Sequence, residues 1–71
     1  MSKQIWKVQW NRHTAEIFKS ENFYHFYYDG EWQLDDRIGK YQDDNDAIES
    51  WRINCNIPKN YINLITLPPL R

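Results

Sequence analysis

The side chains of this 71-residue chain that could bind a metal or act as a nucleophile include two histidines and one cysteine. His13 and His25 are twelve positions apart, and Cys55 is distant from both. No two of them have a spacing typical of zinc ligands, so we predict no metal site. Cys55 has no base near it in sequence, which favours a buried, inert thiol over a nucleophile. We expect His25 to be a hydrogen-bonded structural residue and His13 a solvated turn residue.

Acidic residues gather in the segment DDRIGKYQDDND, residues 35–46. An EF-hand calcium loop needs glycine at position six and glutamate at position twelve. Counting from Asp35, those positions hold Lys40 and Asp46, so the segment does not match. Adjacent carboxylates such as Asp35 and Asp36 point apart on a strand or loop, and a chain this short rarely encloses a pocket. The sequence therefore predicts a protein that is not an enzyme and uses no cofactor.

Aromatic residues are the most distinctive chemical feature: four Trp, five Tyr and three Phe form 17% of the chain. Many of them lie in FYHFYYDGEW, residues 23–32, around one tight turn. A buried ring removes about 150–250 Å² from water. A short chain with one cysteine, which cannot form an internal disulfide, needs such rings to build a core. Some of these rings must be core, and the others would form a surface.

The net charge of −1 is unevenly spread, with +2 on residues 1–28, −6 on 29–51 and +3 on 52–71. Solvated turns and a helix N-terminus account for the acidic middle. A mean hydropathy of −0.92 and short apolar runs argue against a membrane span. The first four residues lead directly into a strand-like pattern without a leader sequence. These features predict a cytoplasmic protein with no membrane partner.

Apolar residues alternate with polar ones over 3–10, which predicts a half-buried strand, and again over 14–19. Residues 23–28 are a third strand, rich in residues that fit pleated surfaces. Asp29-Gly30 predicts a type I′ turn, because glycine takes a positive φ without steric cost. Residues 31–34 then form a fourth strand.

Residues 35–42 lose the periodicity and predict a loop, with room for a short strand. Several acids at 43–46 are N-cap candidates for a helix of roughly residues 44–54, with Ala47, Ile48 and Trp51 on its apolar face. Residues 61–67 predict a last strand. The whole chain, 1–71, is therefore expected to be a single α+β domain of order β-β-β-β-α-β, with the helix on one face of a small antiparallel sheet.

Turn geometry assigns side chains to the two faces. A two-residue turn at Asp29-Gly30 pairs Tyr27 with Trp32, and a three-residue loop at 20–22 pairs Lys19 with Phe23. In these registers the side facing the helix consists of Ala15, Ile17, Phe23, His25, Tyr27, Trp32 and Leu34. The opposite side, which the helix leaves open, carries the aromatic residues Phe18, Tyr24, Phe26 and Tyr28 beside Glu16 and Glu31. A slip of one residue in the 20–22 loop would move the second strand to the opposite face, and the N- or C-terminal strand could also fold over the open face.

A contiguous exposed aromatic patch often marks an interface. The leading hypothesis is a small accessory subunit, regulator or inhibitor that binds a protein partner, with self-association as a variant. The predicted partner-binding residues are Phe18, Tyr24, Phe26 and Tyr28, with Glu16 and Glu31 at the rim. We expect the partner to present Arg or Lys to the aromatic rings.

Two alternatives involve nucleic acid. In one, the chain binds phosphate through basic residues near its ends, which are Lys3, Lys7, Arg12, Arg52, Lys59 and Arg71. In the other, the acids of residues 29–49 mimic a phosphate backbone and occupy the nucleic-acid site of another protein. Basic side chains are not interleaved with the aromatic rings, and this favours the protein partner.

Overall fold

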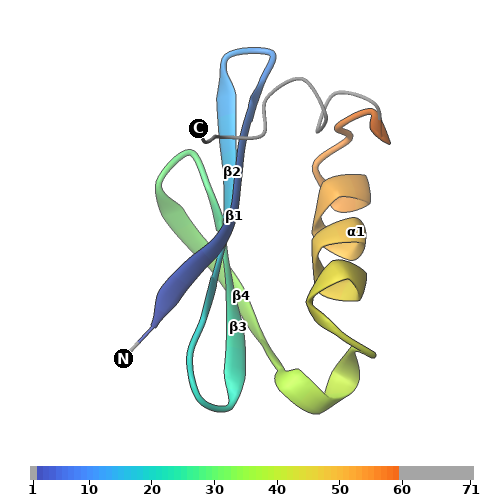
Figure 1. The fold of residues 1–71 in the computed structure, drawn as a ribbon. Helices are drawn as coiled ribbons and strands as arrows, with labels where there is room; N and C mark the ends of the chain where they lie inside the picture. Colours follow the sequence, from blue (N-terminus) through green and yellow to red (C-terminus); the bar gives the residue numbers. More distant parts are fainter. Residues whose placement is uncertain (1, 60–71) are drawn as a thin grey trace, which may run out of the picture.

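A computed structural model describes residues 2–59 of the chain. Four antiparallel strands are adjacent in chain order: β1 (Lys3–Trp10), β2 (His13–Lys19), β3 (Phe23–Tyr28) and β4 (Glu31–Arg37). A 3-10 helix, η1 (Ile38–Lys40), leads to α1 (Asp44–Asn54), which lies along one side of the sheet (Figure 1). The predicted α+β class and the order of strands and helix are confirmed. The strand predicted over 61–67 lies outside the described residues.

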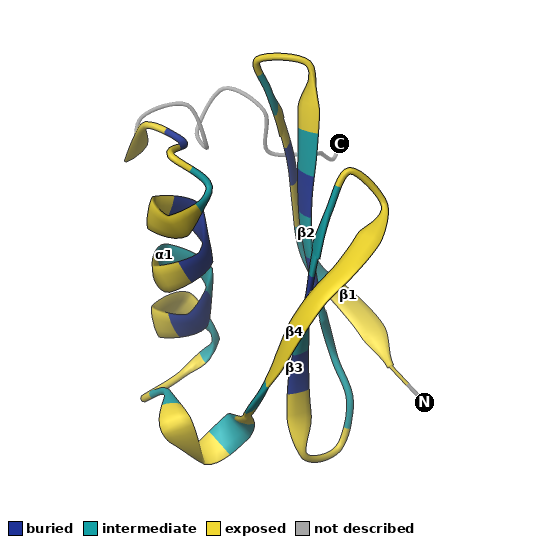
Figure 2. Cartoon of the chain, turned by 180° about the vertical axis from the view of Figure 1, so that it is seen from behind, coloured by how far each residue is buried: buried dark blue, intermediate teal, exposed yellow. Residues whose placement is uncertain are grey.

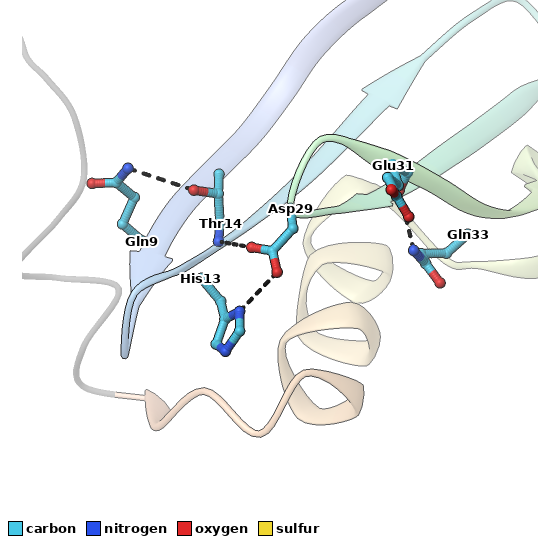
Figure 3. Close-up of polar contacts among 6 residues, drawn as sticks. All are labelled: Gln9, His13, Thr14, Asp29, Glu31 and Gln33. Carbon is cyan, nitrogen blue, oxygen red and sulfur yellow. Dashed lines mark hydrogen bonds and ion pairs between the residues drawn. The ribbon is translucent and has the colours of Figure 1, made fainter.

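Two tight turns join the outer strand pairs. Asp29 and Gly30 have φ angles of 53° and 80°, as the predicted type I′ turn requires. Asn11 and Arg12 adopt the same left-handed conformation between β1 and β2, with φ angles of 56° and 69°. Asp29 also ties its turn to β2, because its carboxylate accepts from the backbone N–H of Thr14 at 3.0 Å (Figure 3).

The helix has the termini that its sequence favours. The side chain of Asp43 accepts a hydrogen bond from the backbone N–H of Asp46 at 3.0 Å, which makes Asp43 the N-cap. At the other end Asn56 takes a φ of 61°, and the N–H of Ile57 donates to the carbonyl of Arg52 at 3.1 Å. This is a Schellman arrangement, which turns Ile57 back into the core. The predicted helix over 44–54 agrees with α1.

The core lies between α1 and the side of the sheet that faces it, which we call the helix face. Figure 2 shows the buried side of α1 turned toward the strands. The predicted contacts Ala47 and Trp51 are buried, and Ile48 packs against the same cluster. The buried cluster consists of Val8, Ala15, Ile17, Tyr24, Phe26, Ala47, Trp51 and Ile57.

The predicted register between β2 and β3 is wrong by one residue. Lys19 pairs with Tyr24, and Ile17 pairs with Phe26, where we expected Phe23 and His25. The reason is the length of the turn: the N–H of Ser20 donates to the carbonyl of Phe23 at 2.9 Å, so four residues separate the paired ends. The structure therefore has the one-residue shift between the second and third strands that the sequence had not excluded.

The strand β4 also departs from the prediction. The pairs Tyr28–Glu31 and Tyr27–Trp32 are as expected from the Asp29-Gly30 turn, but a bulge follows and Phe26 pairs with Leu34. The extra residue is Gln33. The strand then continues to Arg37 through residues expected to form a loop, since the N–H of Ile38 donates to the carbonyl of Asn22 at 3.0 Å.

These shifts exchange the faces of the aromatic strand. Tyr24 and Phe26, predicted to be exposed, are each 1% exposed, and Tyr28 packs against the core beside them. Phe23, His25, Tyr27 and Trp32, predicted to be core, pair with residues on the opposite side of the sheet. Ala15 and Ile17 are core as expected. Leu34 is on the helix face but is 38% exposed.

Candidate protein-binding face

The helix α1 covers one side of the sheet only (Figures 1 and 2). We call the side away from α1 the open face, and it carries exposed aromatic side chains. Trp32 is 58% exposed and Phe23 is 38% exposed. Phe18, His25 and Tyr27 are half-buried between them in the sheet. Their positions follow from the ladder, because Phe18 pairs with His25, and Tyr27 pairs with Trp32. Aromatic side chains from three neighbouring strands therefore share one surface.

Two of these rings form a corner. The ring centroids of Phe18 and Tyr27 are 5.3 Å apart, and their planes are inclined by 74°. A hollow of about 280 Å³ lies beside them, lined by Ser2, Glu16, Phe18, His25, Tyr27 and Gly30. The carboxylate of Glu16, which accepts a hydrogen bond from Gln4 Nε2 at 2.6 Å, is the acidic group of this hollow. Aromatic faces beside a carboxylate form a surface that favours a cation.

A chain of hydrogen bonds lies next to the aromatic corner. His25 Nδ1 is 2.8 Å from Asp35 Oδ1, and His25 Nε2 is 2.9 Å from Ser20 Oγ. Trp32 Nε1 donates to the same Asp35 oxygen at 2.7 Å. The bond from Trp32 and the contact with His25 lower the pKa of Asp35, although partial burial opposes them. His25 is hydrogen-bonded as predicted, but on the open face and not in the core.

The charged groups of the open face have both signs. Glu16 faces Lys7 across the β1–β2 ladder, and Asp35 lies on β4. The guanidinium of Arg37 lies 5.8 Å from the centroid of the Phe23 ring. The sequence predicted an aromatic face with an acidic rim and no basic residue, whereas Lys7 and Arg37 also lie on this face; Glu16 is the acidic group of the hollow beside Phe18 and Tyr27.

The structure separates the six predicted partner-binding residues. Phe18 and Glu16 lie on the open face, while Tyr24, Phe26 and Tyr28 lie on the helix face beneath α1. Glu31 is exposed at the start of β4 and pairs with Tyr28. Sequence reasoning missed Phe23, Tyr27 and Trp32 as surface residues, because every position of β3 is occupied by an aromatic ring or histidine. The pairing of Tyr27 with Trp32, which was predicted correctly, did place those two on a common face.

Within residues 2–59, the basic residues of the nucleic-acid alternative are not brought together. Arg52 is 8% exposed; it donates to the carbonyl of Ile57 at 2.6 Å and pairs with Glu49. Lys3 pairs with Lys19, whose side chain reaches Asp44 of α1, whereas Lys7 pairs with Glu16 on the open face. Arg12 and Lys59 are exposed elsewhere, and Arg71 lies outside the described residues.

Residues 2–59 contain neither a metal-binding cluster nor a helix that could span a membrane. No group of three or more His, Cys, Asp or Glu side chains in that range is arranged to hold a metal ion. None of the helices described there is long and apolar enough to cross a membrane. Cys55 is a half-buried free thiol, and burial raises its pKa to about 11.

Comparison of the chain with protein-family models, with curated proteins and with solved structures found no match.

Proposed function

We propose that the protein is a small binding module of the cytoplasm, acting as an accessory subunit, regulator or inhibitor, and that its open face binds a protein partner. The observation that carries this proposal is the exposure of Trp32 and Phe23 next to the half-buried rings of Phe18 and Tyr27. Aromatic side chains with large exposed area dominate protein interfaces, because they bury much surface at little conformational cost.

The chemistry of the hollow indicates the kind of partner. Phe18 and Tyr27 present ring faces, and Glu16 supplies a negative charge beside them. A lysine or arginine side chain of the partner would meet both kinds of attraction in one place. The partner is therefore proposed to insert a basic side chain at this corner while its apolar residues cover Trp32 and Phe23.

The experiment compares two double variants in affinity capture from the source cells. Phe23→Ser with Trp32→Ser removes the exposed rings of the open face. Leu34→Ser with Ile53→Ser is the matched control, since these residues are similarly exposed, at 38% and 59%, but do not lie on the open face. A partner retained by the wild type and by the control, but lost by the open-face variant, supports the proposal. Equal retention by all three proteins contradicts it.

The contribution of the acidic corner is tested by the single change Glu16→Gln. This change preserves the shape of the hollow and removes its charge. We expect the affinity for the captured partner to fall about 2- to 5-fold, in the range of an exposed ion pair, because the aromatic rings of the hollow are unchanged. An unchanged affinity would show that the partner does not use a basic side chain at this position.

A further inference from the structure

Ser20, His25 and Asp35 form a hydrogen-bonded row on the open face that has the connectivity of a nucleophile, a base and an orienting acid. Ser20 Oγ is 2.9 Å from His25 Nε2, and His25 Nδ1 is 2.8 Å from Asp35 Oδ1. Both distances are within the range in which serine, histidine and carboxylate cooperate in nucleophilic catalysis. The row comes from three places in the chain: the turn after β2, the middle of β3, and β4.

The strand register explains why these three residues meet. His25 pairs directly with Asp35 across the β3–β4 ladder, on the open face. Ser20 begins the four-residue turn before β3, and its N–H is held by the carbonyl of Phe23 at 2.9 Å. No spacing motif in the sequence predicts the cluster, because it depends on the turn length and on the bulge at Gln33.

The protonation states needed for chemistry follow from the contacts. An ionised carboxylate only accepts hydrogen bonds, so Asp35 requires a hydrogen on His25 Nδ1. The Nε2 atom of a neutral ring is then an acceptor, and it faces the hydroxyl of Ser20. Trp32 Nε1 donates to the same Asp35 oxygen at 2.7 Å. The Ser20 hydroxyl has a competing acceptor in the carbonyl of Phe23, but at a longer distance of 3.3 Å.

We propose that Ser20 is an activated nucleophile for acyl transfer, with His25 as its general base and Asp35 as the residue that positions His25. This inference rests on contacts that the proposed protein partner does not require, although His25 also lines the hollow beside Phe18 and Tyr27. It departs from the sequence-based expectation that the chain is not an enzyme. The substrate class is a carboxylic ester. The site opens on the surface, since Ser20 is half-buried and also lines a shallow hollow with Ser2, Lys3 and Lys19.

The reaction balances with water as the only co-reactant. Ser20 Oγ attacks the carbonyl carbon while its proton moves to His25 Nε2, and the carbonyl electrons move to the oxygen. Collapse of the tetrahedral species expels the alcohol, which takes the proton from Nε2, and leaves an acyl-Ser20 ester. Water then attacks this ester, gives a proton to Nε2, and releases the carboxylic acid while Ser20 Oγ recovers the proton.

The test is covalent labelling of the full chain with a fluorophosphonate probe, in which the serine oxygen displaces fluoride. Intact-protein mass spectrometry and peptide mapping are expected to find one adduct, at Ser20, and none in Ser20→Ala. Loss of the general base in His25→Ala should slow labelling at least about 100-fold. The thermal midpoint of each variant is measured alongside, so that a labelling defect is compared only between folded proteins.

The chain supplies a matched control histidine. His13 Nδ1 lies 2.8 Å from Asp29 Oδ2, but within residues 2–59 no serine hydroxyl is bonded to its ring (Figure 3). His13→Ala should therefore leave the labelling rate unchanged, as should Ser50→Ala on the exposed side of α1. The positioning role of Asp35 predicts slower labelling in Asp35→Asn and partial recovery in Asp35→Glu. No adduct at Ser20, or an equal labelling rate without His25, would overturn the inference.

Discussion

Tyr24 donates a hydrogen bond of 2.7 Å from its hydroxyl to Asp44 Oδ1, which ties a ring buried in the sheet to the first turn of α1. Lys19 Nζ donates to the same oxygen at 2.9 Å. Burial, together with this bond to a carboxylate, raises the pKa of Tyr24 to about 12. The contact anchors the helix to the strand whose other side contributes to the open face.

Removal of the Tyr24 hydroxyl should weaken this anchor. For Tyr24→Phe we expect the free energy of unfolding to fall by about 1 kcal/mol, because Asp44 keeps Lys19 as a partner. Urea denaturation measures the change. Tyr27→Phe on the same strand is the control, since the Tyr27 hydroxyl has no hydrogen-bond partner within residues 2–59. Equal effects of the two changes would show that the bond to Asp44 adds nothing to stability.

The same contact predicts how stability depends on pH. The hydrogen bonds from Tyr24 and Lys19 hold the pKa of Asp44 below its usual value. A carboxyl whose folded-state pKa is lowered stabilises the fold above its unfolded pKa of about 4 and loses this contribution as pH falls through the folded pKa. The difference in stability between wild type and Asp44→Asn should therefore be largest near pH 7 and shrink toward pH 3. A difference independent of pH would contradict this account.

The two sides of β3 can be compared with one chemical change. Phe26 is 1% exposed and touches Trp51, with ring centroids 5.1 Å apart, whereas Phe23 is 38% exposed. We expect Phe26→Leu to lower the free energy of unfolding by about 1–2 kcal/mol through lost packing. Phe23→Leu should change it by less than about 0.5 kcal/mol. Thermal or urea unfolding of both variants measures the difference, and the reverse order would mean that the faces are assigned incorrectly.

Local signals in the sequence predicted most of the elements. Alternation predicted the strands over 3–10 and 14–19, and Ala15 and Ile17, which were assigned to the helix-facing side, are core. The acids near position 43 and the spacing of Ala47 and Trp51 located α1 correctly. The Asp29-Gly30 dipeptide predicted its turn type and the first two cross-strand pairs.

The faces of β3 could not be predicted from the same kind of signal. A half-buried strand normally reveals its inner face by alternation of apolar and polar residues. Residues 23–28 are aromatic or histidine throughout, so both registers bury apolar rings and the pattern does not choose between them. In the structure Tyr24 is placed on the inner face by the four-residue turn at Ser20–Phe23, which is local but has no sequence motif, and it is held there by its tertiary bond to Asp44 of α1. The bulge at Gln33 could not be predicted either, because it contains no glycine, the residue that often marks a bulge in a strand.

Cys55 should be unreactive in the folded protein. Burial raises the pKa of its thiol from the ordinary 9.0 to about 11, which lowers the thiolate fraction at pH 8 about 100-fold. The rate of reaction with a disulfide reagent is expected to increase by about this factor when the protein is unfolded in urea. A similar rate in the native and unfolded protein would show that the thiol is accessible and ionised normally.

The most direct test of the proposed binding face is the indole N–H region of an ¹⁵N-correlated NMR spectrum, recorded while the captured partner is added. Trp32 exposes its ring on the open face, while Trp51 is buried on the other side of the sheet and donates its indole N–H to the carbonyl of Tyr27 at 3.2 Å. We predict that the Trp32 signal shifts or broadens as the partner binds and that the Trp51 signal stays in place. A change at Trp51 with an unaltered Trp32 signal would contradict binding at the open face.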